Sequence, residues 1–144
     1  MFKKILVPVD IDYPNAARSV YQKAAKIAGF TGAEIKLIGV LPGFGMPIVA
    51  TFITEEVRQE AYDRFKASLE TFITENCDEP VPFTIRTGKN WEEIIHAADK
   101  WGADLIVVYH NQRREINEVF SRSCSQRVSD NAKCSVLRLR HIQS

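Results

Sequence analysis

Short, continuous apolar runs alternate with segments of helical spacing, and this alternation constrains the fold most strongly. Residues 5–9 and 105–109 are apolar without interruption, as expected of strands that are buried on both faces of a parallel sheet. Three further runs are predicted as strands: residues 35–40, 81–86 and 135–139. Because helices alternate with these strands, the sequence predicts right-handed βαβ units. The fold class is therefore α/β, a doubly wound five-stranded parallel sheet with helices on both faces. The strand order that we expect for it is 3-2-1-4-5.

Helix boundaries can be predicted from proline, glycine and capping residues. Pro14 opens the first helix, since the first helical position needs no N–H donor, and Gly29 with Gly32 ends it. Thr54 is expected to cap a long helix that runs to about Asn76. Residues 57, 61, 65, 69 and 72 would line one face of this helix.

Two further helix starts carry capping-box spacing. Asn90 with Glu93 predicts one, and Ser123 with Gln126 predicts the other. At the second start, the alternative is an anion site made by hydroxyl and N–H groups at the positive helix end, with Arg122 adding a phosphate contact.

Length and composition limit the classes of protein. The chain has 144 residues, the size of one domain, so 1–144 is interpreted as a single domain. Its net charge of +1 argues against nucleic-acid binding, and the absence of any apolar run of about 18 residues argues against membrane insertion. The odd number of cysteines, without CxxC spacing, argues against a disulfide framework or zinc site and favours a cytoplasmic protein.

In doubly wound sheets, ligands bind beyond the carboxyl ends of the strands, where the strand order reverses. The segments that would meet there are Asp10, residues 40–42, residues 88–90, and Tyr109 onward. This prediction uses topology alone.

Sequence motifs in the predicted strands and turns resemble those of universal stress proteins. Residues 7–10 resemble the opening strand of that family, residues 102–108 its fourth strand, and residues 132–137 its last strand. The Gly88 turn before an acidic helix is also in place. The resemblance spans essentially the whole chain, in order.

Many members of this family bind ATP, through the signature Gly-x2-Gly-x9-Gly-Ser/Thr after the fourth strand. In a gapless register laid back from Cys134, the three glycine positions fall on Tyr109, Gln112 and Arg122, and the hydroxyl position falls on Ser123. Glycines in such a loop let backbone N–H groups close on phosphate oxygens. Because three of the four positions carry bulky side chains, we expect the usual triphosphate cradle to be lost.

The remaining candidate positions lie on the first two strands. By resemblance, Asp10 would lie near a ribose; the alternative is an Asx turn or a helix cap. Val40 would meet adenine through its backbone, or is simply a buried strand residue. The candidate nucleotide-site positions are Pro8, Val9, Asp10, Val40, Tyr109, Gln112, Arg122 and Ser123.

Two loops leave alternatives open. Arg113 and Arg114 either clamp a phosphate or belong to a solvated loop. His110 could act as a proton shuttle. Because no Ser, Cys or carboxylate partner can be assigned to it from the sequence, no catalytic triad is proposed. Residues 41–53 form a lid over the cleft, a packed connection or an oligomer contact.

The resemblance also implies a homodimer, paired through the fifth strand. Arg138 stands at a position that is usually apolar there, and Arg140 and His141 follow. Charges on an edge strand discourage such pairing, so the usual interface is in question.

Three functions compete. The favoured one is a non-catalytic stress-response regulator that acts through an unknown protein partner, without ATP bound in the usual way. The alternative is a switch that binds ATP, ADP or AMP in a rebuilt phosphate site. An enzyme is disfavoured, because the sequence contains neither a Walker motif nor a cluster of metal-binding carboxylates.

Overall fold

The computed structural model describes residues 1–43, 53–111 and 118–140, and its strands form one five-stranded parallel sheet in the order β3-β2-β1-β4-β5. This confirms the predicted fold class and strand order. The strands are β1 (Lys4–Pro8), β2 (Glu34–Pro42), β3 (Phe83–Gly88), β4 (Leu105–Tyr109) and β5 (Ser135–Leu139). The order reverses between β1 and β4, so the carboxyl ends of these strands flank the position where doubly wound folds bind ligands.

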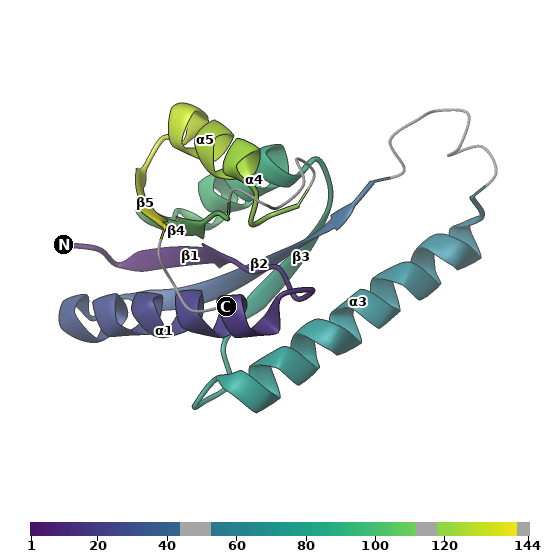
Figure 1. The fold of residues 1–144 in the computed structure, drawn as a ribbon, viewed down its shortest axis with the longest axis horizontal. Coiled ribbons are helices and arrows are strands. Elements are labelled where there is room, and N and C mark those ends of the chain that lie inside the picture. Colours follow the sequence, from purple (N-terminus) through teal and green to yellow (C-terminus); the bar gives the residue numbers. More distant parts are fainter. Residues whose placement is uncertain (44–52, 112–117, 141–144) are drawn as a thin grey trace.

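Helices cover both faces of the sheet (Figure 1). One face carries α1 and α3, and the other carries α4 and α5. Their bounds are α1 (Pro14–Thr31), α3 (Glu55–Asn76), α4 (Asn90–Trp101) and α5 (Arg122–Asn131). None of the helices in the described ranges is long and apolar enough to cross a bilayer.

The core is centred on β1 and β4. All five residues of β4 are buried, as are four of the five in β1, which explains why both segments lack polar alternation. Phe120, just before α5, is the largest fully buried side chain. The core therefore reaches into the segment that precedes α5, close to the candidate site.

The first helix follows its predicted boundaries. Pro14 occupies its first turn, and Gly32 ends it in the left-handed conformation with φ of 72°. The Gly32 N–H donates to the Ala28 carbonyl at 2.8 Å, as expected for a glycine that terminates a helix. Gly29 lies inside the last turn instead of ending the helix.

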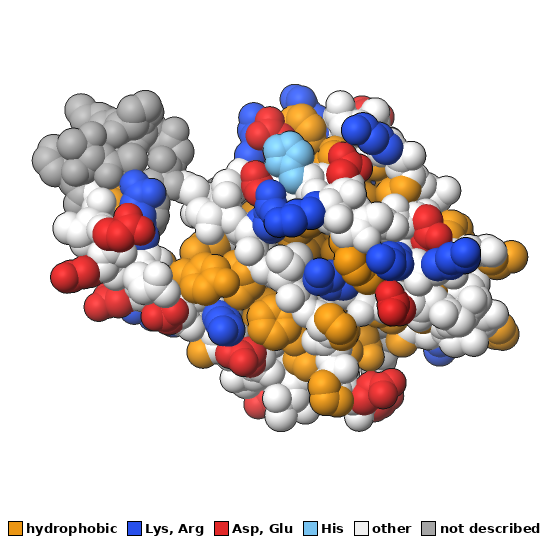
Figure 2. Space-filling model, turned by 180° about the vertical axis from the view of Figure 1, so that it is seen from behind, with side chains coloured by type: hydrophobic (Ala, Val, Ile, Leu, Met, Phe, Trp, Pro, Cys, Tyr) orange, Lys and Arg blue, Asp and Glu red, His pale blue; other side chains and the backbone are white. Residues whose placement is uncertain are grey.

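The long helix α3 begins at its predicted cap but is only partly packed. The Thr54 hydroxyl oxygen accepts a hydrogen bond from the Val57 N–H at 3.2 Å. Of the predicted apolar face, only Leu69 and Phe72 are buried, whereas Val57 is 46% exposed. The start of α3 stands apart from the body of the molecule as an arm (Figure 2). The apolar face of this helix is thus fully buried only in its second half.

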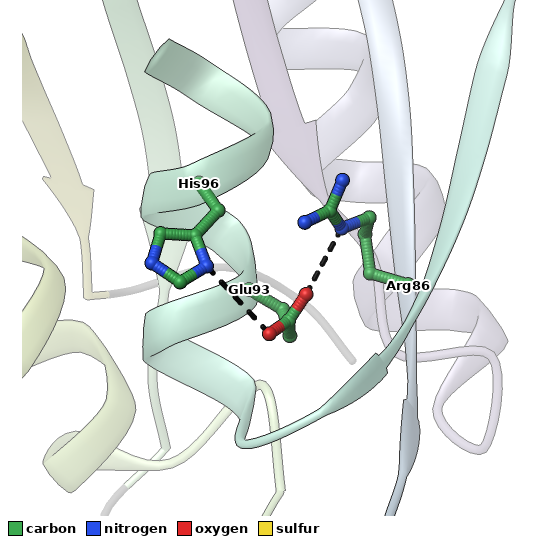
Figure 3. Close-up of polar contacts among 3 residues, drawn as sticks. All are labelled: Arg86, Glu93 and His96. Atoms are coloured by element: carbon green, nitrogen blue, oxygen red, sulfur yellow. Dashed lines mark hydrogen bonds and ion pairs between the residues drawn. The ribbon is translucent and has the colours of Figure 1, made fainter. Parts of the chain in front are cut away.

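The predicted capping box at the start of α4 is also wrong. Lys89 is the residue before the helix and makes no side-chain cap, while Asn90 is already helical. The Glu93 carboxylate instead accepts from Arg86 Nε of β3 at 2.9 Å and lies 3.7 Å from His96 Nδ1 (Figure 3). Glu93 therefore joins α4 to β3 instead of closing the helix end.

At α5 the cap lies two residues earlier than predicted. The Ser121 Oγ accepts the Cys124 N–H at 3.0 Å, and Ser123 lies within the first turn of the helix. The hydroxyl of Ser121 thereby occupies one of the N–H groups that an anion at this helix end would use.

Candidate functional site

A pocket of about 240 Å³ lies at the carboxyl ends of β1 and β2, beside the point where the strand order reverses. It combines the residues after β1 with the end of β2, one residue of α3 and the segment before α5. The lining residues are Val9, Asp10, Ile11, Asp12, Val40, Pro42, Phe65, Glu118 and Val119. This is the edge of the sheet at which topology predicts a ligand.

Asp10 is the predicted polar residue of this pocket. Burial, with smaller contributions from the neighbouring charges of Asp12 and Glu118, raises the pKa of its carboxyl from 3.8 to about 6. The backbone N–H groups of Asp12 and Phe120 act in the opposite direction. The Asp12 N–H donates to Asp10 Oδ1 at 3.2 Å, which is the Asx turn considered from the sequence.

Glu118 is the second carboxylate and comes from the segment before α5. Its Oε1 accepts a hydrogen bond from the Tyr13 hydroxyl at 2.9 Å, and its backbone carbonyl accepts from Asn90 Nδ2 at 3.1 Å. Its Oε2 is shielded from solvent and has no hydrogen-bond partner among the described residues. Glu118 therefore ties the starts of α1 and α4 together and keeps one acceptor unused.

The pocket is acidic on its described walls. Asp10, Asp12 and Glu118 line it, and no Lys, Arg or His is among its described lining residues. Nowhere in the described ranges do three or more His, Cys, Asp or Glu side chains gather in a way that could hold a metal ion. In their ionised form, these carboxylates accept hydrogen bonds and carry negative charge.

Tyr109 and Arg122, at two of the three predicted glycine positions, are not among the described lining residues of this pocket. Tyr109 is 3% exposed and packs edge-on against Phe120, with ring centroids 5.2 Å apart. Arg122 is an exposed residue in the first turn of α5, beside the half-buried Ser123. Gln112, Arg113, Arg114 and His141 lie outside the described residues, as does most of the loop predicted at 41–53.

The other predicted positions do gather here. Val9, Asp10 and Val40 line the pocket, and Pro8 is buried at the end of β1. Sequence reasoning missed Asp12, Phe65 and Glu118. A second acidic residue two positions after Asp10 could have suggested Asp12, but Glu118 falls inside the variable spacer of the glycine signature and carries no pattern.

His110 is placed differently from the pocket residues. It is 5% exposed, and its Nδ1 has no hydrogen-bond partner in the described part of the chain. Burial lowers its pKa, and the charges of Arg138, Arg140 and Arg122 lower it further. A buried neutral imidazole among arginines is poorly suited to take up a proton.

A larger hollow, of about 610 Å³, lies at the opposite edge of the sheet. It is formed by the end of α1, the start of β2, the segment before β3 and Trp101. None of the candidate nucleotide-site positions is among its described lining residues. Its volume alone therefore does not make it the preferred site.

Comparison with known sequences identifies the family. The model of the universal stress protein family matches residues 1–140. Universal stress protein A homolog 2 of Coxiella burnetii is 27% identical to this chain, over 96% of the chain and 95% of the relative.

Solved structures agree with the fold. Universal stress protein UspA from Lactobacillus plantarum superposes with a TM-score of 0.69 at 24% identity, covering 96% of this chain and 98% of that one. The universal stress protein from Archaeoglobus fulgidus, solved in complex with dAMP, superposes with a TM-score of 0.58 at 20% identity, covering 95% and 97% of the two chains. Given the family match over almost its full length, the chain belongs to the universal stress protein family.

Proposed function

We propose that this chain is a cytoplasmic, non-catalytic regulator of the stress response that does not hold ATP in a glycine cradle. The packing of Tyr109 carries this proposal. A phosphate loop needs backbone N–H groups that can close on the phosphate oxygens, whereas the Tyr109 ring is buried against Phe120 at the first glycine position. The acidic pocket supports the same proposal, because a triphosphate placed there would meet three carboxylates.

The test is calorimetric titration with Mg·ATP, together with denaturing release of any nucleotide that copurifies with the protein. We expect no released nucleotide and no heat of binding. Micromolar ATP binding that is weakened by Arg122→Ala would overturn the proposal. Arg64→Ala, an exposed change on α3, controls for the loss of one positive charge.

A second candidate is a switch that binds an adenine ligand in the Asp10 pocket. Two observations favour it: the pocket lies at the carboxyl ends of β1 and β2 with Asp10 in its wall, and a structural relative was solved with dAMP. We expect Asp10→Asn to weaken such a ligand at least tenfold, because a carboxylate is the stronger acceptor of hydroxyl hydrogen bonds. Asp78→Asn, at an exposed position, is the matched control.

The partner we propose is a second copy of the chain, paired along β5. Arg138 donates to Ser125 Oγ at 3.1 Å and to Gln126 Oε1 at 3.3 Å. These bonds hold its charge over α5 and leave Leu137, which is 37% exposed, available for contact. Sedimentation equilibrium should give a dimer that Leu137→Asp converts to a monomer. An unchanged dimer in that variant would exclude this interface.

A further inference from the structure

We propose that the Asp10 pocket selects an uncharged ligand that carries hydroxyl groups, such as a nucleoside, over the corresponding phosphorylated ligand, and that Glu118 sets this selectivity. The inference rests on the second candidate function, an adenine ligand in this pocket. It adds the chemical class of that ligand and names Glu118 as the residue that distinguishes an uncharged ligand from a phosphorylated one.

The first argument is charge. The three ionisable side chains in the described walls, Asp10, Asp12 and Glu118, are all acidic. Like charges repel more strongly when they are partly shielded from water, because the effective dielectric constant is lower there. A phosphate group entering this pocket adds one or two negative charges with no described cation to offset them.

The second argument is hydrogen-bonding capacity. Glu118 Oε2 is shielded from solvent without a donor among the described residues, whereas Oε1 is held by the Tyr13 hydroxyl. The nucleoside hydroxyl that carries the phosphate in a nucleotide can donate to such an acceptor when it is free, but an ionised phosphate oxygen can only accept. Because Oε2 has no described protein bond to lose, a small turn of the carboxylate toward a hydroxyl needs no compensation at that atom.

The third argument is size. The pocket measures about 240 Å³, which is below the roughly 300–1,000 Å³ of sites that enclose drug-sized ligands. A sugar with part of a base fits this volume better than a nucleoside triphosphate. Phe65, Val40 and Val119 supply apolar surface for the flat part of such a ligand.

The test compares adenosine, AMP and ATP by calorimetric titration of the full chain at one pH and ionic strength. We expect adenosine to bind at least about tenfold more tightly than AMP, a difference of about 1.4 kcal/mol. Glu118→Gln preserves the shape of the side chain and removes its charge, so it should reduce the preference for adenosine to less than about threefold. Asp12→Asn, at an exposed position, should shift the preference in the same direction by a smaller factor.

Glu70→Gln, an exposed change on α3, is the matched control and should leave the preference unchanged. If AMP binds wild-type protein as tightly as adenosine does, the inference is wrong while the adenine-ligand function stands. If neither adenosine nor either nucleotide binds, both fail together. The comparison of adenosine with AMP on the wild-type protein tests the selectivity without any variant. The inference can therefore be overturned even if the Glu118→Gln protein folds poorly.

Discussion

The Tyr13 hydroxyl donates a hydrogen bond to the Glu118 carboxylate at 2.9 Å, across 105 positions of sequence. This bond joins the residue before α1 to the segment before α5, and these two helices cover opposite faces of the sheet. It also fixes one oxygen of a carboxylate whose other oxygen has no described partner. The orientation of Glu118 in the pocket therefore depends on Tyr13.

Removing the hydroxyl of Tyr13 should destabilise the fold. In Tyr13→Phe, the Glu118 carboxylate loses its described donor, and an unsatisfied, partly buried acceptor costs about 1–3 kcal/mol. Urea denaturation should show a lower midpoint with an unchanged slope. Tyr62→Phe, whose side chain lies on α3 and is 36% exposed, should have no effect. An equal loss in both variants would contradict the assigned role of this bond.

Asp10 should make stability depend on pH. Its folded pKa, about 6, is above the ordinary value of 3.8, so the folded state binds the proton more tightly than the unfolded state. The contribution of Asp10 to the free energy of unfolding should therefore be most favourable below pH 4, fall between pH 4 and 6, and level off above that. Asp10→Asn removes this decrease and should stabilise the protein at pH 8 by on the order of 2 kcal/mol.

Thermal denaturation of wild-type protein and Asp10→Asn across pH 4–8 measures this effect. Asp78→Asn, with an exposed side chain, should retain the wild-type profile. If Asp10→Asn also loses stability between pH 4 and 6, another group is responsible for the titration.

Gly39 should not tolerate a side chain. A Cβ at this position of β2 would lie 2.7 Å from Cε1 of the Phe65 ring and 3.5 Å from Leu69. Gly39→Ala should therefore displace the ring and destabilise the protein by about 1–3 kcal/mol. Because Phe65 also lines the pocket, ligand binding should weaken as well.

The double variant Gly39→Ala with Phe65→Ala tests the cause. The second substitution removes the clashing ring, so the two changes together should cost less than the sum of their separate effects. Strict additivity in denaturant titrations would show that the contact between these residues is not the source of the loss.

Gly88 is constrained by its backbone and by Glu93. Its φ is 145°, and an added Cβ would lie 3.1 Å from Glu93 Cγ and 3.2 Å from Oε2, the carboxylate that binds Arg86. Gly88→Ala should cost on the order of 2 kcal/mol. Gly29→Ala is the control, because Gly29 lies in α1 with nothing within 4 Å of the added carbon, and it should be neutral or stabilising by up to about 1 kcal/mol. Equal melting temperatures for the two variants would argue against this account.

The sheet could be predicted because strands buried on both faces leave continuous apolar runs. The apolar runs at β1 and β4 can be identified as strands without knowing which strands lie beside them, because burial on both faces alone makes such strands apolar throughout. The packing of α3 could not be predicted in this way. Its apolar spacing is regular from Val57 to Phe72, but spacing does not reveal that Val57 is left exposed while Phe72 is covered.

The candidate site was predictable where it lies on strands and not where it depends on long-range contacts. Asp10 and Val40 follow from topology, because carboxyl ends of parallel strands share one edge. The position of the cap at α5 did not follow, since Ser121 and Ser123 both offer a hydroxyl and only the backbone path decides which one lies before the helix. Glu118 required the structure, because its roles come from Tyr13 and Asn90.

The packing of Tyr109 against Phe120 also has an evolutionary consequence. Tyr109 is 3% exposed in the core, so replacing it with glycine would leave a cavity and cost about 3–5 kcal/mol, a large share of the stability of a typical domain. A single Tyr109→Gly substitution is therefore a costly first step toward a glycine loop at this position. A stabilising change elsewhere in the core would have to come first, so the packing of Tyr109 constrains the order in which substitutions can be fixed.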